Sequence, residues 1–262
     1  MSLASIALRE ERSAILAWSI ALLLYMLLVG SSYAAVRETK EFEQVWKDLP
    51  EGFREAFGGA TDVTSVHGYT ISRVSAFPLL LGLYALFAGT KRLAGAEESG
   101  ALDHLLARPV SRNRFYGGAA AACGVALLLV LAGALVGTLL GFVVSGLSAH
   151  ELLGVAGAVA DIVPMIALWW GVGLLVGAAF HRRGPALGAG LGVLLGTYAL
   201  HVALNVADRL EWLSYLNPFG YYQRSDLFHG SPDPLYWFLL PVVGGAAAWV
   251  GLGLFARKDL FA

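Results

Sequence analysis

The chain has 262 residues, of which 57% are hydrophobic and only 14% are charged, and its mean hydropathy is +0.66. Most of such a chain cannot form the surface of a water-soluble domain, so the composition indicates an integral membrane protein. The net charge is -1 and the arginines are scattered among acids, which excludes a nucleic-acid partner because phosphate binding needs a clustered basic surface.

Six apolar runs are long enough to cross a bilayer, which takes about 20 helical residues. In chain order they are residues 14–36, 74–90, 117–147, 152–180, 185–206 and 235–255. A short hinge at His150 and Glu151 separates the third run from the fourth. The expected fold is an all-α integral membrane protein, with six transmembrane helices forming a single domain over residues 1–262.

Before the first run, Leu3, Ile6 and Ala7 share one helical face, which predicts an N-terminal interfacial helix in the headgroup layer. The connecting segments then decide the orientation. Segments 1–13, 91–116, 181–184 and 256–262 carry eleven Lys or Arg against six acids, whereas the opposite set carries seven against twelve. The positive-inside rule therefore predicts a multi-pass protein with both termini in the cytoplasm.

A compact charged segment, AEESGALDHLLARPVSRNR, lies between the second and third runs at residues 96–114. It contains two acids (Glu97, Glu98), three leucines spaced i, i+3 and i+4 on one helical face (Leu102, Leu105, Leu106), a terminating proline (Pro109) and three arginines (Arg108, Arg112, Arg114). The pattern predicts a short amphipathic helix at about residues 96–108, presented to a partner.

Motifs for catalysis are absent from the sequence. The chain has four lysines, and none stands in a phosphate-binding G-x-x-x-x-G-K-[ST] loop, so this chain is not expected to hydrolyse ATP. No H-E-x-x-H pair and no G-x-S-x-G elbow occurs either. We therefore expect that the chain is not an enzyme, with no catalytic residue, no metal site and no cofactor of its own.

Three polar residues within the apolar runs are candidate functional residues. Asp161, three residues before Pro164, is either a functional carboxylate on a transport pathway or the cap of a helix broken at that proline. His201 and Asn205 lie one turn apart in the fifth run and either line a polar stripe of the pathway or serve as packed polar groups.

Small residues recur at four-residue spacing in two runs, which lets helices approach closely. The third run carries Gly133, Gly137 and Gly141, and the fifth carries Gly184, Gly188, Gly192 and Gly196. The series on the fifth run, in particular Gly188, Gly192 and Gly196, is the candidate contact with a second copy. The single cysteine, Cys123, lies in an apolar run and is interpreted as a small buried residue.

Residues 97–100 (EESG) and 105–112 (LLARPVSR) together resemble the signature of ABC-2 type permeases, the type-2 ABC exporters, where it follows the second span. The six-span layout, the stretch Leu216-Asn217-Pro218-Phe219 and the ending Arg257-Lys258-Asp259-Leu260 are also similar to that family. One departure is Gly118, where many relatives have a lysine.

The resemblance implies a coupling helix that fits into a groove of a separate ABC ATPase subunit, which would hold ATP with Mg. The residues implied to couple to that ATPase are Glu97, Glu98, Leu102, Asp103, Leu105, Leu106, Arg108, Pro109 and Arg112. It also implies a second permease copy or a paralogue as a partner. Spans one, two and five would line the transport path, which would carry amphipathic or lipidic cargo in contact with membrane lipid. The implied location is the plasma membrane of a bacterium or archaeon.

Two other functions remain open at this point. An ion- or proton-coupled secondary transporter would use Asp161 as its carrier, although inverted repeats and broken helices are not evident. A membrane scaffold or enzyme subunit is the third possibility.

Overall fold

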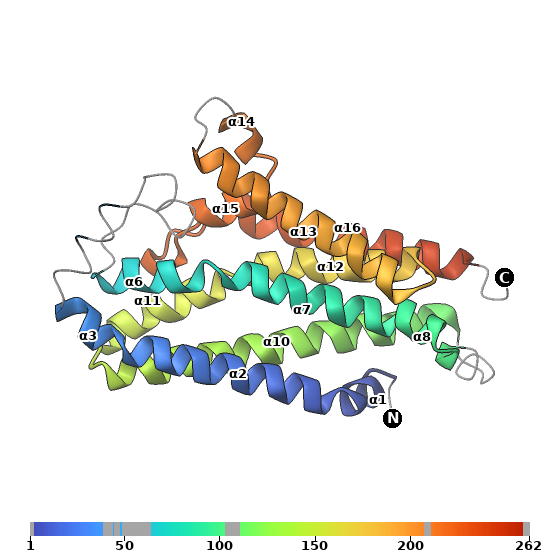
Figure 1. Cartoon of the computed structure of the whole chain (residues 1–262), viewed down its shortest axis with the longest axis horizontal. Coiled ribbons are helices and arrows are strands. Elements are labelled where there is room, and N and C mark those ends of the chain that lie inside the picture. Colours follow the sequence, from blue (N-terminus) through green and yellow to red (C-terminus); the bar gives the residue numbers. More distant parts are fainter. Residues whose placement is uncertain are drawn as a thin grey trace.

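The computed structural model of the chain describes residues 3–38, 44, 48, 64–102, 111–206 and 211–258. These residues form an elongated bundle of helices that run roughly along one axis (Figure 1). The helices are α1 (Leu3–Glu10), α2 (Arg12–Ser31), α3 (Tyr33–Glu38), α6 (Val66–Val74), α7 (Phe77–Arg92), α8 (Ala94–Glu98), α10 (Arg112–Val144), α11 (Ala149–Ala160), α12 (Val163–Ala179), α13 (Arg183–Val206), α14 (Glu211–Ser214), α15 (Pro218–Arg224), the 3-10 helix η2 (Leu227–His229) and α16 (Pro234–Arg257).

Within the described residues, six helical stretches are long and apolar enough to cross a membrane. They are Arg12–Glu38, Val66–Glu98, Arg112–Val144, Ala149–Ala179, Arg183–Leu204 and Pro234–Arg257. Many of their large apolar side chains point outward and are exposed, such as Leu153 and Trp249 at about three quarters of their surface. Apolar side chains on the outside of a bundle suit a lipid surrounding. The predicted all-α membrane fold with six spans is confirmed.

The break between spans three and four lies earlier than the sequence analysis placed it. Helix α10 ends at Val144, and Gly146 adopts a left-handed conformation with φ of 78°. Ser148 then caps α11 in a capping box with Glu151, so His150 and Glu151 belong to the first turn of the helix. The hinge predicted at His150 and Glu151 is therefore wrong, because a helix-capping pair was read as a connection.

Local sequence explains where several other helices begin. Ser65, Ser111 and Asp233 accept hydrogen bonds from backbone N–H groups of the first turns of α6, α10 and α16. Prolines occupy the first positions of α7, α12 and α16, where the missing N–H would have no helical partner. Each cap satisfies backbone groups that would otherwise be stranded at a helix end.

Glycines bring two pairs of spans into backbone contact. Helix α10 packs on α2 through Gly133, Gly137 and Gly141, and a Cβ atom added at Gly137 would lie 2.2 Å from the Leu23 carbonyl oxygen. Helix α12 meets α16 at Gly171 and Gly244 with the same closeness. Backbones approach this closely only where side chains are missing. Cys123, on α10, is fully buried in this core.

The two ends of the bundle differ in the helices and charged residues that they contain. Helices α1 and α8 and the last turn of α16 lie at one end, and α3, α6, α14 and α15 lie toward the other (Figure 1). We call the first the charged end, defined by Glu97, Glu98, Arg112, His181, Arg183 and Lys258. Helix α1 is a separate short helix before α2 and packs against α10; its predicted place in the headgroup layer remains a prediction.

Candidate functional site

The acidic segment after span two begins as a helix and then turns. Helix α8 carries Glu97 and Glu98 at its end, and Gly100 follows with φ of 69°, in the left-handed region that favours glycine. Leu102 is 1% exposed and packs with Leu93, Tyr116 and Phe255. Leu102 thus holds the segment on the chain's own core. Asp103, Leu105, Leu106, Arg108 and Pro109 lie outside the described residues, so the predicted helix at 96–108 is described only at its start.

The two acids connect this segment to distant parts of the chain. The Glu97 carboxylate accepts a hydrogen bond from Lys258 Nζ at 2.6 Å and also contacts His181 Nδ1. The Glu98 carboxylate accepts a hydrogen bond from the Arg183 backbone N–H at 3.0 Å. One helical turn is therefore bonded both to the connection between α12 and α13 and to the end of α16.

Arg112, at the start of α10, completes this arrangement. Its Nη1 atom donates to the carbonyl oxygens of Lys258 at 2.6 Å and of Ala256 at 3.3 Å. Basic side chains stabilise the open carbonyls of a helix C-terminus. The charged end consequently joins the ends of spans two, three, four, five and six, and the docking roles predicted for its residues stay predictions.

A second ion-pair group anchors the N-terminal helices. Glu11, between α1 and α2, accepts a hydrogen bond from Arg92 Nε at 3.1 Å and lies 3.4 Å from Lys91 Nζ. The Arg92 side chain is 5% exposed, and the Glu11 side chain is 12% exposed. A largely buried guanidinium needs such a partner, because an unpaired charge is costly away from water. The start of span one is thereby fixed to the end of span two.

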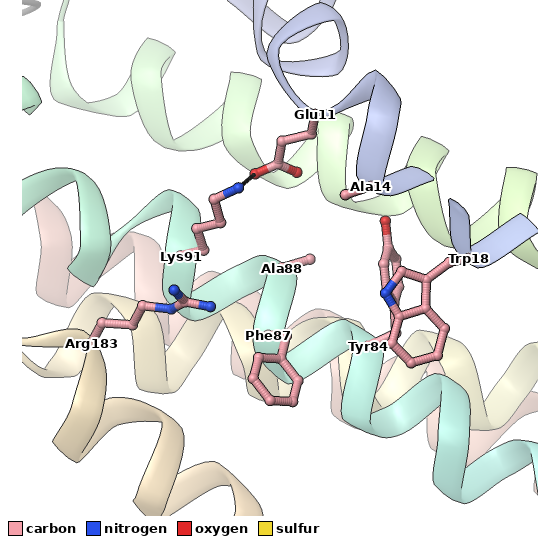
Figure 2. A pocket seen from close by; sticks show the side chains of 8 residues that line it. All are labelled: Glu11, Ala14, Trp18, Tyr84, Phe87, Ala88, Lys91 and Arg183. Carbon is pink, nitrogen blue, oxygen red and sulfur yellow. Dashed lines mark ion pairs between the residues drawn. The ribbon is translucent and has the colours of Figure 1, made fainter. Parts of the chain in front are cut away.

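A pocket of about 320 Å³ opens beside this pair. It is lined by Glu11, Ala14, Trp18, Tyr84, Phe87, Ala88, Lys91 and Arg183 (Figure 2). The Trp18 and Tyr84 rings meet edge to face at 5.5 Å and form an aromatic wall, while Lys91 points toward Glu11 (Figure 2). The pocket therefore combines an apolar wall with a charged rim, and its residues come from spans one, two and five and from the connection before span one.

Asp161 lies at the junction of α11 and α12 and is 3% exposed. Its carboxylate accepts hydrogen bonds from Ser225 Oγ at 2.8 Å, from Trp237 Nε1 at 2.8 Å and from the Leu227 backbone N–H at 3.4 Å. It is the C-cap residue of α11, whereas the N-cap of α12 is Ile162, without a side-chain cap. The carboxylate instead binds the connection between α15 and α16 to the middle of span four.

The two polar residues of span five are placed differently. His201 is buried, and its ring stacks on Phe219 with centroids 5.9 Å apart. Asn205 belongs to α13, but its side chain lies outside what the structure describes. A polar stripe formed by both residues therefore remains a prediction.

The glycine series on span five faces open space. A Cβ atom added at Gly184, Gly188, Gly192 or Gly196 would meet nothing within 4 Å. The series on span three is the opposite case, since Gly133, Gly137 and Gly141 are covered by α2. Intrachain packing thus accounts for the span three series, whereas the predicted contact of Gly188, Gly192 and Gly196 with a second copy remains a prediction.

Comparison with known proteins identifies the class of the chain. No curated protein matches the sequence. The family described as the C-terminal domain of the multidrug efflux system permease Rv1217c matches residues 2–256. This match and the six apolar helices indicate a multi-pass membrane permease that serves a transport system of several components. Since the match covers nearly the whole chain, the protein belongs to this family of multidrug efflux permease domains.

Proposed function

We propose that this protein is the transmembrane subunit of an ATP-driven exporter of the ABC-2 type. A separate ATPase subunit would bind ATP with Mg and contact the segment at residues 96–108. The observation that carries the proposal is the bonding of Glu97 and Glu98 to Lys258 and Arg183. A force applied to this segment would reach spans four, five and six directly.

The chemistry of the segment suits a protein groove. Leucines at Leu105 and Leu106 would fill an apolar groove, and the charges around them would fix the register of docking. Leu102 is buried in the chain's own core and would hold the start of this segment in place. Leu102 would therefore attach the start of the segment to the permease, and Leu105 and Leu106 further along the segment would bind the ATPase.

The pocket beside Glu11 is the proposed entry for cargo. Its aromatic wall of Trp18, Tyr84 and Phe87 would bind the apolar part of an amphipathic molecule, and its charged rim would face the polar part. Because spans one, two and five supply most of the lining, a shift of the charged end would change its shape.

A second permease copy or a paralogue would complete the path, with α13 as the contact. The proposal also places both termini and the charged end in the cytoplasm of a bacterial or archaeal cell, because the ATPase acts on ATP there. The alternative, a secondary transporter driven through Asp161, is not favoured. That carboxylate already accepts three hydrogen bonds and serves as an anchor.

The test is stimulation of a co-expressed ATPase. Leu105→Asp with Leu106→Asp should abolish stimulation of ATP hydrolysis by the permease in nanodiscs, while membrane insertion stays normal. The matched control, Leu105→Met with Leu106→Met, keeps the apolar face and should retain stimulation. Unchanged stimulation in the aspartate variant would count against docking through this segment, and export by the purified chain without any nucleotide would refute the ATP-driven function.

A further inference from the structure

Two histidines and one aspartate meet at the end of the bundle opposite the charged end. His67 lies in the first turn of α6, Asp226 precedes η2, and His229 ends η2. One ligand atom from each of the three residues lies within 4.8 Å of the others. His67 Nε2 is 3.5 Å from Asp226 Oδ1, and His229 Nδ1 is 2.6 Å from Asp226 Oδ2.

We propose that His67, Asp226 and His229 form a binding site for a divalent transition-metal ion of the zinc type. Imidazole nitrogens and a carboxylate oxygen are the ligands that zinc prefers beside thiolates, at bond lengths of about 2.0–2.2 Å. In a tetrahedral site with such bonds, two ligand atoms of one ion lie about 3.4 Å apart. The separation of 3.5 Å between His67 Nε2 and Asp226 Oδ1 matches this value, and the 2.6 Å between His229 Nδ1 and Asp226 Oδ2 would widen as the ion enters between them.

Each of the three residues presents a ligand atom toward the others, so an ion between them would replace the contacts that they now make with one another. His229 would bind the ion through Nδ1 with its proton on Nε2, and His67 through Nε2 with its proton on Nδ1.

The surroundings hold the three ligands in place while leaving access from solvent. The turn that carries two of them is closed by paired backbone hydrogen bonds between Asp226 and Ser231, and Gly230 permits the turn with φ of 74°. The His67 ring packs against Phe228 with centroids 4.9 Å apart. The His229 side chain remains 55% exposed, so an ion can enter and a water can fill the remaining coordination position.

A bound ion would connect three spans at this end. His67 begins span two, and the turn at residues 225–231 precedes span six. Ser225 and Leu227 of the same turn already bind the Asp161 carboxylate in span four. Zinc would therefore link span two to the turn, which is already bonded to span four. The stability of the helix packing at this end would rise on binding.

The test uses the full chain in nanodiscs and Zn²⁺ alone, measured by competition with a chromophoric chelator. We expect one saturable Zn²⁺ per chain and a rise in melting temperature on binding. His67→Ala and His229→Ala should each weaken binding by at least about tenfold, a loss seen even when only a supporting partner of a ligand is removed. The matched control is His150→Ala, an exposed histidine in the first turn of α11 that is outside the cluster.

A second measurement needs no substitution and so does not depend on how the variants fold. Cu²⁺ bound to the unsubstituted chain should give an electron paramagnetic resonance spectrum with splitting from two imidazole nitrogens. Absence of saturable Zn²⁺ binding, or a Cu²⁺ spectrum without nitrogen splitting, would overturn the proposal. Equal binding by the His67, His229 and His150 variants would do the same.

Discussion

The Nζ atom of Lys258 lies 2.6 Å from the Oε2 atom of Glu97, so the end of the sixth span is bonded to the end of the second. The same Nζ atom donates to the Phe180 carbonyl oxygen at 2.7 Å, at the end of α12. The Lys258 side chain is 8% exposed and that of Glu97 is 13% exposed. A charge pair this sheltered from water fixes three chain segments to one another.

Lys258→Met should loosen the charged end. We expect a loss of about 1 to 3 kcal/mol in stability, below the full cost of stranding a buried charge because His181 still faces Glu97. The melting temperature of the purified chain measures this loss. Arg257→Met is the control, since it removes the same charge from an exposed neighbouring position. Equal melting temperatures for the two variants would show that the bond to Glu97 contributes nothing.

Asp161→Asn should reduce stability rather than abolish transport in a folded protein. The asparagine keeps one acceptor oxygen, but its NH2 group would face one of the donors, either the Leu227 N–H or the pair from Ser225 and Trp237. An unsatisfied buried group of this kind costs about 1 to 3 kcal/mol. Thermal unfolding and export should be measured on the same preparation. A variant of normal stability that has lost all export would instead support a carrier role for the carboxylate.

Trp237→Phe provides a graded comparison at the same site. It removes one of the three donors to Asp161 and leaves the carboxylate in place. Hydrogen bonds between membrane helices contribute about 0.6 kcal/mol on average. We therefore expect a small drop in melting temperature, well below that of Asp161→Asn, and unchanged export.

Gly192→Leu should weaken the pairing of two permease copies without affecting the folding of each copy. The added side chain meets open space within the single chain, so the monomer should fold normally, whereas a contact through α13 would be blocked. Crosslinking yield and mass photometry measure pairing. Gly137→Leu is the contrasting variant, because its side chain would collide with Leu23 of α2 and should prevent folding. Undiminished pairing of the Gly192 variant would exclude this face of α13 as the contact between the two copies.

Phe87→Ala should weaken recognition of cargo. The ring lines the pocket and is 41% exposed, so its loss removes apolar contact surface without opening a hole in the core. Removing about 60 Å² of apolar contact corresponds to about tenfold in affinity, to be measured as the KM for export of an amphipathic dye. Phe238→Ala is the control, an exposed ring on span six outside the pocket. Equal KM values for the two variants would show that the pocket is not part of the transport path.

The membrane fold could be predicted from sequence because crossing a bilayer leaves a strong, local signal. Six runs of apolar residues gave the right number of spans. Span two nevertheless begins at Val66 rather than near residue 74, since the polar first turns around His67 and Arg73 dilute the hydropathy of the run. A site built from packed polar groups likewise produces no strong hydropathy signal in the sequence.

Contacts between distant residues could not be predicted. Nothing in the sequence indicates that His67 meets Asp226 and His229, or that Ser225 and Trp237 share the Asp161 carboxylate. These meetings depend on helix packing, which a single sequence does not encode in any short pattern. The start of α11 is a different case, because Ser148 and Glu151 form a recognisable S-x-x-E pair that could have corrected the hinge wrongly predicted at His150 and Glu151.

The burial of Cys123 makes the chain convenient for spectroscopy. As the sole thiol in the sequence, enclosed within the core, it is shielded from water-soluble maleimides. Spin labels or fluorophores can therefore be attached at two introduced cysteines without first removing a native one. Distances across the pocket, or between the start of span two and the start of span six, can then be followed in the otherwise unaltered polypeptide while nucleotide or zinc is added.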